Sequence, residues 1–115
     1  MNKPDIIAQE HQWLTVFEIY VRQHLADTWL TVPVLAAAFS LSESSLLRQL
    51  KRLTGLSPGA YLQKMRLQEA RRLLESGATS SVAATVARVG YKDARSFSRL
   101  FHKRFGKLPS AYLRK

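Results

Sequence analysis

The sequence contains no cysteine, and this absence excludes disulfide bonds, thiolate metal sites and cysteine nucleophiles. Acidic residues are few as well: the eight aspartates and glutamates form no cluster typical of metal ligands, and the three histidines are scattered. The five glycines form no phosphate-binding loop, and no serine stands in a nucleophile-base pattern. These absences predict that the protein is not an enzyme and that it binds no metal and no cofactor.

Long hydrophobic runs are also missing. No apolar stretch approaches the length of a membrane span, and the N-terminal sequence MNKPDIIAQEHQ lacks the hydrophobic region of a secretory signal. We therefore expect a cytoplasmic protein. With 115 residues, of which 46% are hydrophobic, the chain can form one domain or two very small helical units that share a core.

The net charge of +10 is distributed unevenly along the chain. Residues 1–40 contain two basic and four acidic residues, whereas residues 41–115 contain 16 basic and four acidic residues. A block this basic is typical of a protein that meets a polyanion, either a nucleic acid or an anionic membrane surface. The alternative is a solvated basic face that serves solubility.

The stretch from 57 to 76 predicts a single α-helix, around which the rest of the chain is organised. Ser57 is a good N-cap, Pro58 suits the first helical position, and Gly77 offers a left-handed C-cap. The apolar residues of this helix cover an arc too wide for packing on one side only. We therefore expect contacts on both of its flanks, with the helix acting as a linker between two units.

One charged residue, Arg66, lies inside the apolar arc of the linker helix. A buried or half-buried guanidinium needs a partner, because an isolated charge is costly to remove from water. The acid three residues further on, Glu69, is the partner that the helical spacing predicts.

The first unit is expected over about residues 10–56, and residues 1–9 are expected to be a flexible tail or the remnant of a linker. Its three helices are predicted at about 10–26, with aromatic residues in the core, at about 31–39, and at 43–54 after an N-cap at Ser42. A short alanine-rich helix, a tight turn and a longer basic helix are typical of a helix-turn-helix.

The second unit, residues 77–115, repeats this pattern with a shift of 51 residues. It contains an alanine-rich helix at about 81–89, a turn at Gly90, a cap at Asp93 and a basic helix that ends at Phe105. We expect a positive φ at Gly90, and Ser40 replaces it in the first copy. Agreement in cap, core and breaker positions indicates a true internal repeat. The aligned pairs are Arg48 with Arg99, Leu46 with Phe97, Leu50 with Phe101, Gly55 with Gly106, Pro58 with Pro109, and Tyr61 with Tyr112.

Helical wheels give each longer helix an apolar inner face and a cationic outer face. An α-helix fits the major groove of DNA, where arginine can donate to both O6 and N7 of guanine while flanking basic residues neutralise phosphates. We predict DNA contacts for Arg48 and Arg99, with solvated surface as the alternative. The further candidates are Ala94 and Arg95 as base readers, Lys51, Arg52 and Lys103 as phosphate partners, and His102 as a phosphate contact or an ordinary exposed histidine.

Over about residues 13–113 the sequence resembles the DNA-binding domain of AraC-type transcriptional regulators. The runs TVPVLAAAFSLSESSLLRQLKRLTGLSPGAYLQKMRLQEARRLL and GYKDARSFSRLFHKRFGKLPSAYL carry the resemblance. The matching positions are Leu35-Ala36, Arg48, Gly55 with Ser57-Pro58, Arg66-Leu67 with Ala70 and Leu74, Gly90-Tyr91, Phe97, Arg99, Phe101, Phe105-Gly106 and Pro109.

The resemblance implies an all-α domain of about seven helices, in which two homeodomain-like helix-turn-helix units are joined by a long linker helix. It also implies recognition helices, at about 43–54 and 93–105, that enter successive segments of the major groove of double-stranded DNA in transcription regulation. The base-reading positions that it implies are Ser44, Ser45, Leu47 and Arg48 in the first unit, and Ala94, Arg95, Ser96 and Arg99 in the second.

The sequence motifs LTGLSP and FGKLPSAYL are similar to those in the output domains of two-component and hybrid regulators. We therefore expect this chain to be the output domain of a larger signal-responsive protein. RNA polymerase is a further candidate partner. The isolated domain is expected to be monomeric, with any dimerisation through a domain not present here.

Two departures from the family pattern are expected to have consequences. Thr85-Val86 changes the packing of a short helix, and Leu108 replaces the usual serine cap before Pro109, which should weaken the last helix. Two alternative functions stay open at this point. One is a basic helical module that binds RNA or an anionic surface, and the other is a protein-interaction bundle.

Overall fold

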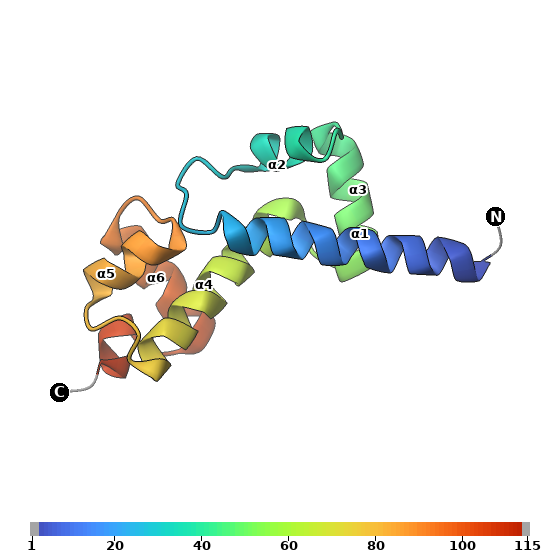
Figure 1. Ribbon diagram of the computed structural model, residues 1–115. Coiled ribbons are helices and arrows are strands. Elements are labelled where there is room, and N and C mark those ends of the chain that lie inside the picture. The colour runs from blue at the N-terminus through green and yellow to red at the C-terminus, as the bar shows by residue number, and fades with distance from the viewer. Residues whose placement is uncertain (1–2, 114–115) are drawn as a thin grey trace.

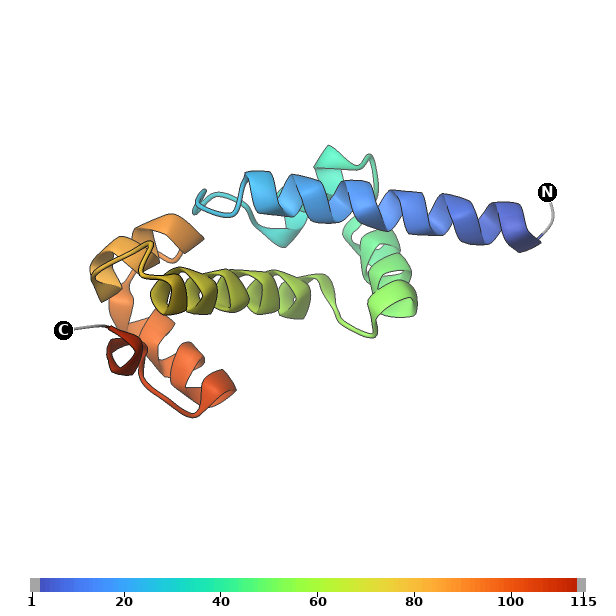
Figure 2. The same ribbon diagram turned by 60° about the horizontal axis from the view of Figure 1, so that its bottom comes forward.

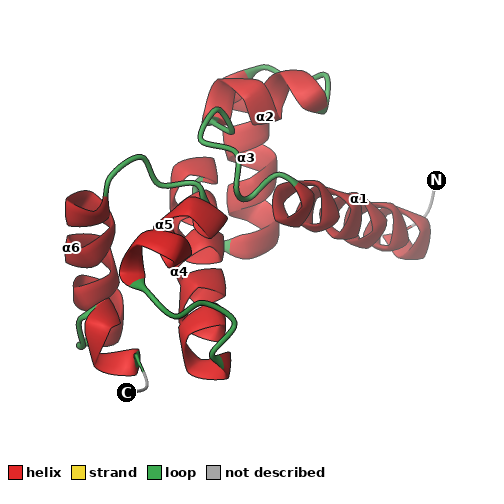
Figure 3. Ribbon diagram, turned by 60° about the vertical axis from the view of Figure 1, so that its left-hand side comes forward, coloured by secondary structure: helices red, strands yellow, loops and turns green. Residues whose placement is uncertain are grey.

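The computed structural model describes residues 3–113, and all of their regular secondary structure is helical (Figures 1 and 3). This confirms the predicted all-α class. The last of the seven expected helices is a 3-10 helix, η1. The elements are α1 Lys3–Gln23, α2 Val32–Ala38, α3 Glu43–Thr54, α4 Pro58–Ser76, α5 Val82–Val89, α6 Ala94–Phe105 and η1 Pro109–Tyr112.

The linker helix α4 is the centre of an elongated molecule of 57 × 25 × 22 Å. Helix α3 lies beside the start of α4, while α5 and α6 lie at its other end (Figure 2). Helix α1 crosses α4, and its N-terminal turns extend beyond the other helices (Figure 1). Each helix-turn-helix pair is therefore attached to its own end of one rigid element.

The bounds of α4 follow from its local sequence as predicted. The Ser57 hydroxyl accepts a hydrogen bond from the backbone N–H of Ala60 at 3.3 Å, and Pro58 begins the helix. Gly77 ends it with a φ of 76°, a left-handed conformation that costs glycine little. The linker helix predicted between residues 57 and 76 is confirmed.

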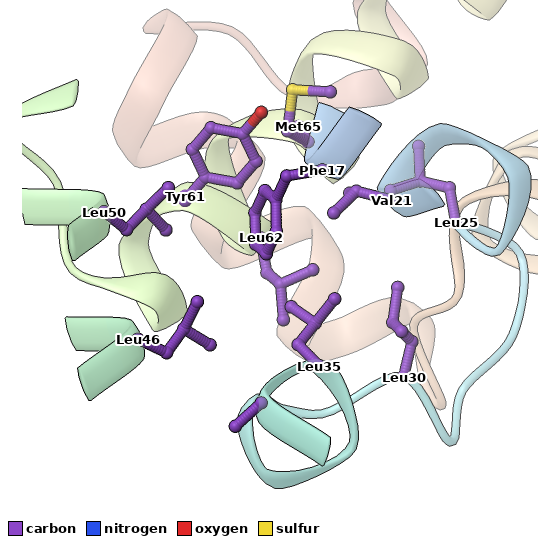
Figure 4. Packing of buried hydrophobic residues seen from close by; sticks show 11 residues of the cluster. Phe17, Val21, Leu25, Leu30, Leu35, Leu46, Leu50, Tyr61, Leu62 and Met65 are labelled. Atoms are coloured by element: carbon purple, nitrogen blue, oxygen red, sulfur yellow. The ribbon is translucent and has the colours of Figure 1, made fainter. Parts of the chain in front are cut away.

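Two separate hydrophobic cores form along α4, so the prediction that it packs on both flanks is also confirmed. In the first core, Tyr61 and Met65 of α4 lie beside Phe17 of α1 (Figure 4). The buried residues of the first core are Phe17, Val21, Leu25, Leu30, Leu35, Ala36, Leu46, Leu50, Tyr61, Leu62 and Met65. Those of the second core are Leu67, Ala70, Leu73, Leu74, Val86, Val89, Phe97 and Phe101.

The first helix is longer than the sequence predicted. It begins at Lys3, so residues 3–9, expected to be a flexible tail, form two further helical turns. Pro4 does not prevent this, because a proline in the first turn of a helix has no hydrogen bond to lose. Periodicity missed these turns because Ile6 and Ile7 are exposed and belong to no core.

The predicted partner of Arg66 is wrong. The guanidinium donates to the backbone carbonyl oxygens of Asp27 at 3.2 Å, Leu30 at 3.1 Å and Gly90 at 3.4 Å. Glu69 instead accepts hydrogen bonds from Arg72 on its own helix. The reason is direction: Arg66 points into the junction of the two units, whereas Glu69 is half-buried at the surface.

The two departures from the family pattern have visible structural counterparts. The Thr85 hydroxyl is buried, and it lies 2.7 Å from the Thr79 hydroxyl and donates to the Ser81 carbonyl at 2.9 Å, so its polar atom is satisfied. Leu108 stands at the N-cap of η1 without a side-chain hydrogen bond, and this last element is a 3-10 helix of four residues. Thr31 likewise stands at the N-cap of α2 without a side-chain hydrogen bond.

Candidate nucleic-acid interface

In the first unit, a short turn brings α3 across the end of α2. Ser40 has a φ of 56°, and the backbone N–H of Leu41 donates to the Ala36 carbonyl at 2.9 Å. The Ser42 hydroxyl then accepts from the backbone N–H of Ser45 at 3.1 Å and begins α3. The inner face of α3 is anchored in the first core through Leu46 and Leu50, which are fully buried, so its opposite face is left to solvent.

The second unit repeats this construction with different side chains. Gly90 has a φ of 80°, and the Asp93 carboxylate accepts from the backbone N–H of Ser96 at 2.7 Å to begin α6. That hydrogen bond is the main reason that the pKa of Asp93 lies below its ordinary value, and the nearby charge of Arg99 adds a smaller effect. Phe97 and Phe101 hold the inner face of α6 in the second core.

The predicted contact residues lie on the outer faces of these two helices. Ten of the twelve are exposed, and Ser45 and Ser96 are half-buried because each is the third helical residue, beside the N-cap. Leu47 is 43% exposed and is the one large apolar residue among these outer-face positions. The exposed ten are Ser44, Leu47, Arg48, Lys51 and Arg52 on α3, and Ala94, Arg95, Arg99, His102 and Lys103 on α6.

Two of the predicted arginines differ in how strongly the protein engages them. Arg48 makes only a long hydrogen bond, 3.4 Å, from its guanidinium to the Ser45 hydroxyl, so it can turn toward another acceptor. Arg52 forms an ion pair with Glu10 of α1, across 42 residues of sequence. Its guanidinium therefore ties α3 to α1, which weakens the prediction of Arg52 as a phosphate partner.

Both recognition-helix candidates end in basic residues, where a positive charge also suits the helix dipole. In α3 these are Lys51 and Arg52, and in α6 they are His102, Lys103 and Arg104. Arg104 was not among the residues predicted from the sequence, although it is exposed and adjoins Lys103. The concentration of basic residues in the last turn of α6 is the sequence signal from which Arg104 could have been predicted as a contact residue.

Among residues 3–113, no helix is both long and apolar enough to cross a membrane. Among the side chains that the structure describes, those of residues 6–113, no three histidines, aspartates or glutamates are grouped so that they could hold a metal ion.

Two capped helices, each with a buried inner face and a cationic outer face, define a helix-turn-helix domain of the DNA-binding kind. A family model described as a helix-turn-helix domain matches residues 35–115. The chain belongs to the AraC-type family of transcription regulators, as its sequence resemblance predicted.

The relatives of this chain are transcription regulators. It is 41% identical over 98 residues to the HTH-type transcriptional activator RhaS of Shigella boydii, an alignment that covers 84% of this chain and 34% of the relative. The C-terminal domain of AraT, a response regulator from Geobacillus stearothermophilus, has 30% identity and a TM-score of 0.78, covering 85% of this chain and 80% of that one.

A third relative was crystallised with DNA. The DNA-binding domain of the global transcriptional factor AdpA, in complex with a target DNA, has 29% identity and a TM-score of 0.79, covering 86% of this chain and 87% of that one. The chain spans about a third of the length of the curated relatives it matches. Together these relationships confirm the predicted class, sequence-specific DNA binding in transcription regulation.

Proposed function

We propose that this chain reads a bipartite, asymmetric site on double-stranded DNA by placing α3 and α6 in successive segments of the major groove. The observation that supports this best is the duplicated construction: two helices with serine or aspartate caps, apolar inner faces and cationic outer faces, attached to one linker helix. Successive groove segments on one face of B-DNA are about 34 Å apart. A chain with both units needs no second copy to read such a site.

The exposed side chains divide into base readers and phosphate partners. Arg48, Arg95 and Arg99 have the reach and the fork geometry for guanine edges, whereas Lys51, His102 and Lys103 stand nearer the helix ends, where phosphates lie. Ser44 and Ala94 are small enough to let their helices approach the base edges. Arg52 contributes to this surface mainly as a charge, because its guanidinium is already paired with Glu10.

We propose further that the domain is the output part of a larger cytoplasmic regulator. Its curated relatives are about three times as long as the aligned region, and AraT, of which a C-terminal domain is similar, is a response regulator. The relative RhaS is an activator, which supports RNA polymerase as a further partner. On this proposal the isolated domain is a monomer that catalyses no reaction, and dimerisation belongs to another domain.

Selection of duplexes from a random DNA pool at about physiological salt tests the proposal. Specific and non-specific binding then differ by roughly 10³-fold or more. We expect enrichment of two short blocks about 10 base pairs apart, without palindromic symmetry. Enrichment of a single block would reject bipartite reading, and binding that only weakens with salt, without enrichment, would favour RNA or an anionic surface as the partner.

Leu47 is expected to read the 5-methyl group of a thymine. Among the predicted base-reading positions of α3, only Arg48 has a long hydrogen-bonding side chain, while Leu47 is exposed beside it and belongs to no core. Apolar side chains in the major groove contact thymine methyl groups, and burial of one methyl is worth about 0.8 kcal/mol. Replacing the contacted thymine of the selected site by uracil should therefore lower affinity about fourfold.

In the Leu47→Ala variant the same uracil replacement should have no effect, because the contact is already lost. The matched control is Leu108→Ala, which removes another exposed leucine outside the recognition helices and should leave the uracil effect intact. Titration of labelled duplexes measures all combinations. An equal uracil effect in the wild type and in Leu47→Ala would assign the methyl contact to another residue.

A further inference from the structure

The two hydrophobic cores meet at a single residue of the linker helix. The first core ends at Met65 and the second begins at Leu67. Between them lies Arg66, which is only 9% exposed although it carries a charge. A buried arginine at the boundary of two apolar cores is uncommon and requires a reason beyond hydrophobic packing.

The guanidinium of Arg66 joins both units. One terminal nitrogen, Nη2, donates to the carbonyl oxygens of Asp27 and Leu30, which belong to the segment between α1 and α2. The other, Nη1, donates to the carbonyl of Gly90 in the turn between α5 and α6. Among residues 6–113, whose side chains the structure describes, this is the one side chain that hydrogen-bonds to both helix-turn-helix units.

The backbones of the two units also approach each other closely at this point. A Cβ atom added to Gly90 would lie 2.3 Å from the carbonyl oxygen of Leu25 and 3.2 Å from the Arg66 guanidinium carbon. The guanidinium therefore fills a junction in which neither loop has room to shift. Its planar fork suits this role, because the direction of each donor is fixed.

The energetics of this contact favour a role in geometry over one in stability. Burial lowers the pKa of Arg66, and the nearby Tyr91 and Asp27 only partly offset that effect. The Nε atom is buried without a hydrogen-bond partner, which is a further cost. Well-packed apolar residues often replace buried charges without loss of stability, so a buried charge can serve structural specificity instead.

We propose that Arg66 is a positioning residue that fixes the placement of the two helix-turn-helix units and so sets the spacing between the two DNA blocks that the domain accepts. This inference rests on the proposed bipartite reading. Each added base pair moves the second block by about 3.4 Å along the axis and by about a tenth of a turn around it. A fixed junction therefore accepts few spacings, and a loosened junction accepts more.

The DNA test compares Arg66→Met with Arg72→Met on duplexes in which the two selected blocks are moved closer or further apart by one and two base pairs. Both variants lose one positive charge from α4, but Arg72 is exposed and pairs with Glu69 of its own helix. The wild type and Arg72→Met should prefer the selected spacing by roughly tenfold or more. Arg66→Met should bind the best spacing less well and lose most of this preference.

A loss of affinity in Arg66→Met that is equal at all spacings would overturn the proposal and leave a purely structural role. Absence of any spacing preference in the wild type would instead contradict the bipartite reading itself. Arg66→Lys covers the case in which Arg66→Met does not fold. Lysine keeps the charge, but its single ammonium group lacks the planar, fixed donors with which the guanidinium reaches three carbonyl groups in two loops. The spacing preference should therefore again fall.

A second measurement needs no DNA and so separates the two proposals. The chain has no cysteine, so cysteines introduced at the exposed Ala37 of α2 and Ala87 of α5 carry the only spin labels. Pulsed electron paramagnetic resonance then gives the distribution of distances between the units. Arg66→Met should broaden this distribution relative to the wild type and Arg72→Met, and an unchanged distribution would overturn the role of Arg66 in positioning.

Discussion

Alanine at both Arg48 and Arg99 is expected to lower affinity for the selected duplex by about 2 to 6 kcal/mol, because each lost bidentate base contact costs about 1 to 3 kcal/mol. The two residues occupy equivalent places in α3 and α6, and their helices are anchored in different cores. Their effects should therefore add. Each single variant should also relax sequence preference in its own block, Arg48→Ala in one and Arg99→Ala in the other.

The fold should survive both substitutions. Each side chain is exposed, and alanine is a strong helix former, so the midpoint of thermal unfolding should hardly change. The matched control is the double variant Arg22→Ala and Arg72→Ala, which removes two exposed arginines from α1 and α4. An equal loss of affinity in that control would attribute binding to net charge and reject the two arginines as base readers.

Helix boundaries could be predicted because the signals that set them are local. Ser42, Ser57 and Asp93 each accept a backbone hydrogen bond within three residues, and each was read as an N-cap from its place before an amphipathic run. The internal repeat extended this reasoning to the backbone. Gly90 and Ser40 were expected to play the same part in the turns of the two units, and both residues have a positive φ. The shift of 51 residues nevertheless aligns Gly90 with Phe39, so the left-handed residue of the first unit lies one position later.

The contacts that hold the units together could not be predicted in the same way. Arg66 donates hydrogen bonds to backbone carbonyl groups of residues 24 to 39 positions away. Every residue has such a carbonyl group, so the sequence does not indicate which ones accept these bonds. The ion pair of Arg52 with Glu10 likewise spans 42 residues, and it depends on how α1 is placed relative to α3. Sequence patterns report local geometry well, whereas the placement of one unit against another depends on non-local contacts.

For the candidate interface, the helical wheels predicted which face of each recognition helix is exposed to solvent. Burial of Leu46 and Phe97 on the inner faces leaves Arg48 and Arg99 outside, as expected. The prediction treated all outward cations alike, and the structure separates them. Arg48 is held loosely, while Arg52 is paired with Glu10. That distinction depends on a neighbouring helix, so no pattern within α3 contains it.

Gly90→Ala is expected to destabilise the domain by about 2 to 5 kcal/mol. Of this, about 1 to 2 kcal/mol reflects an L-residue in the left-handed region at a φ of 80°. A further 1 to 3 kcal/mol, roughly, reflects overpacking, since the new Cβ would lie 2.3 Å from the Leu25 carbonyl oxygen. Urea unfolding measured by circular dichroism gives the free energy of unfolding for comparison with the wild type.

Gly106→Ala separates these two contributions. Gly106 has a φ of 74°, close to that of Gly90, but an added Cβ would meet nothing within 4 Å. Only the backbone strain should then be measured, and Ser40, at a φ of 56° in the equivalent turn of the first unit, shows that such strain alone is tolerated. The excess loss in Gly90→Ala therefore measures how firmly the loop of the first unit is held against the turn of the second. Equal losses in the two variants would mean that the Leu25 carbonyl moves aside at no cost, and a junction that yields so easily could not fix the placement of the two units.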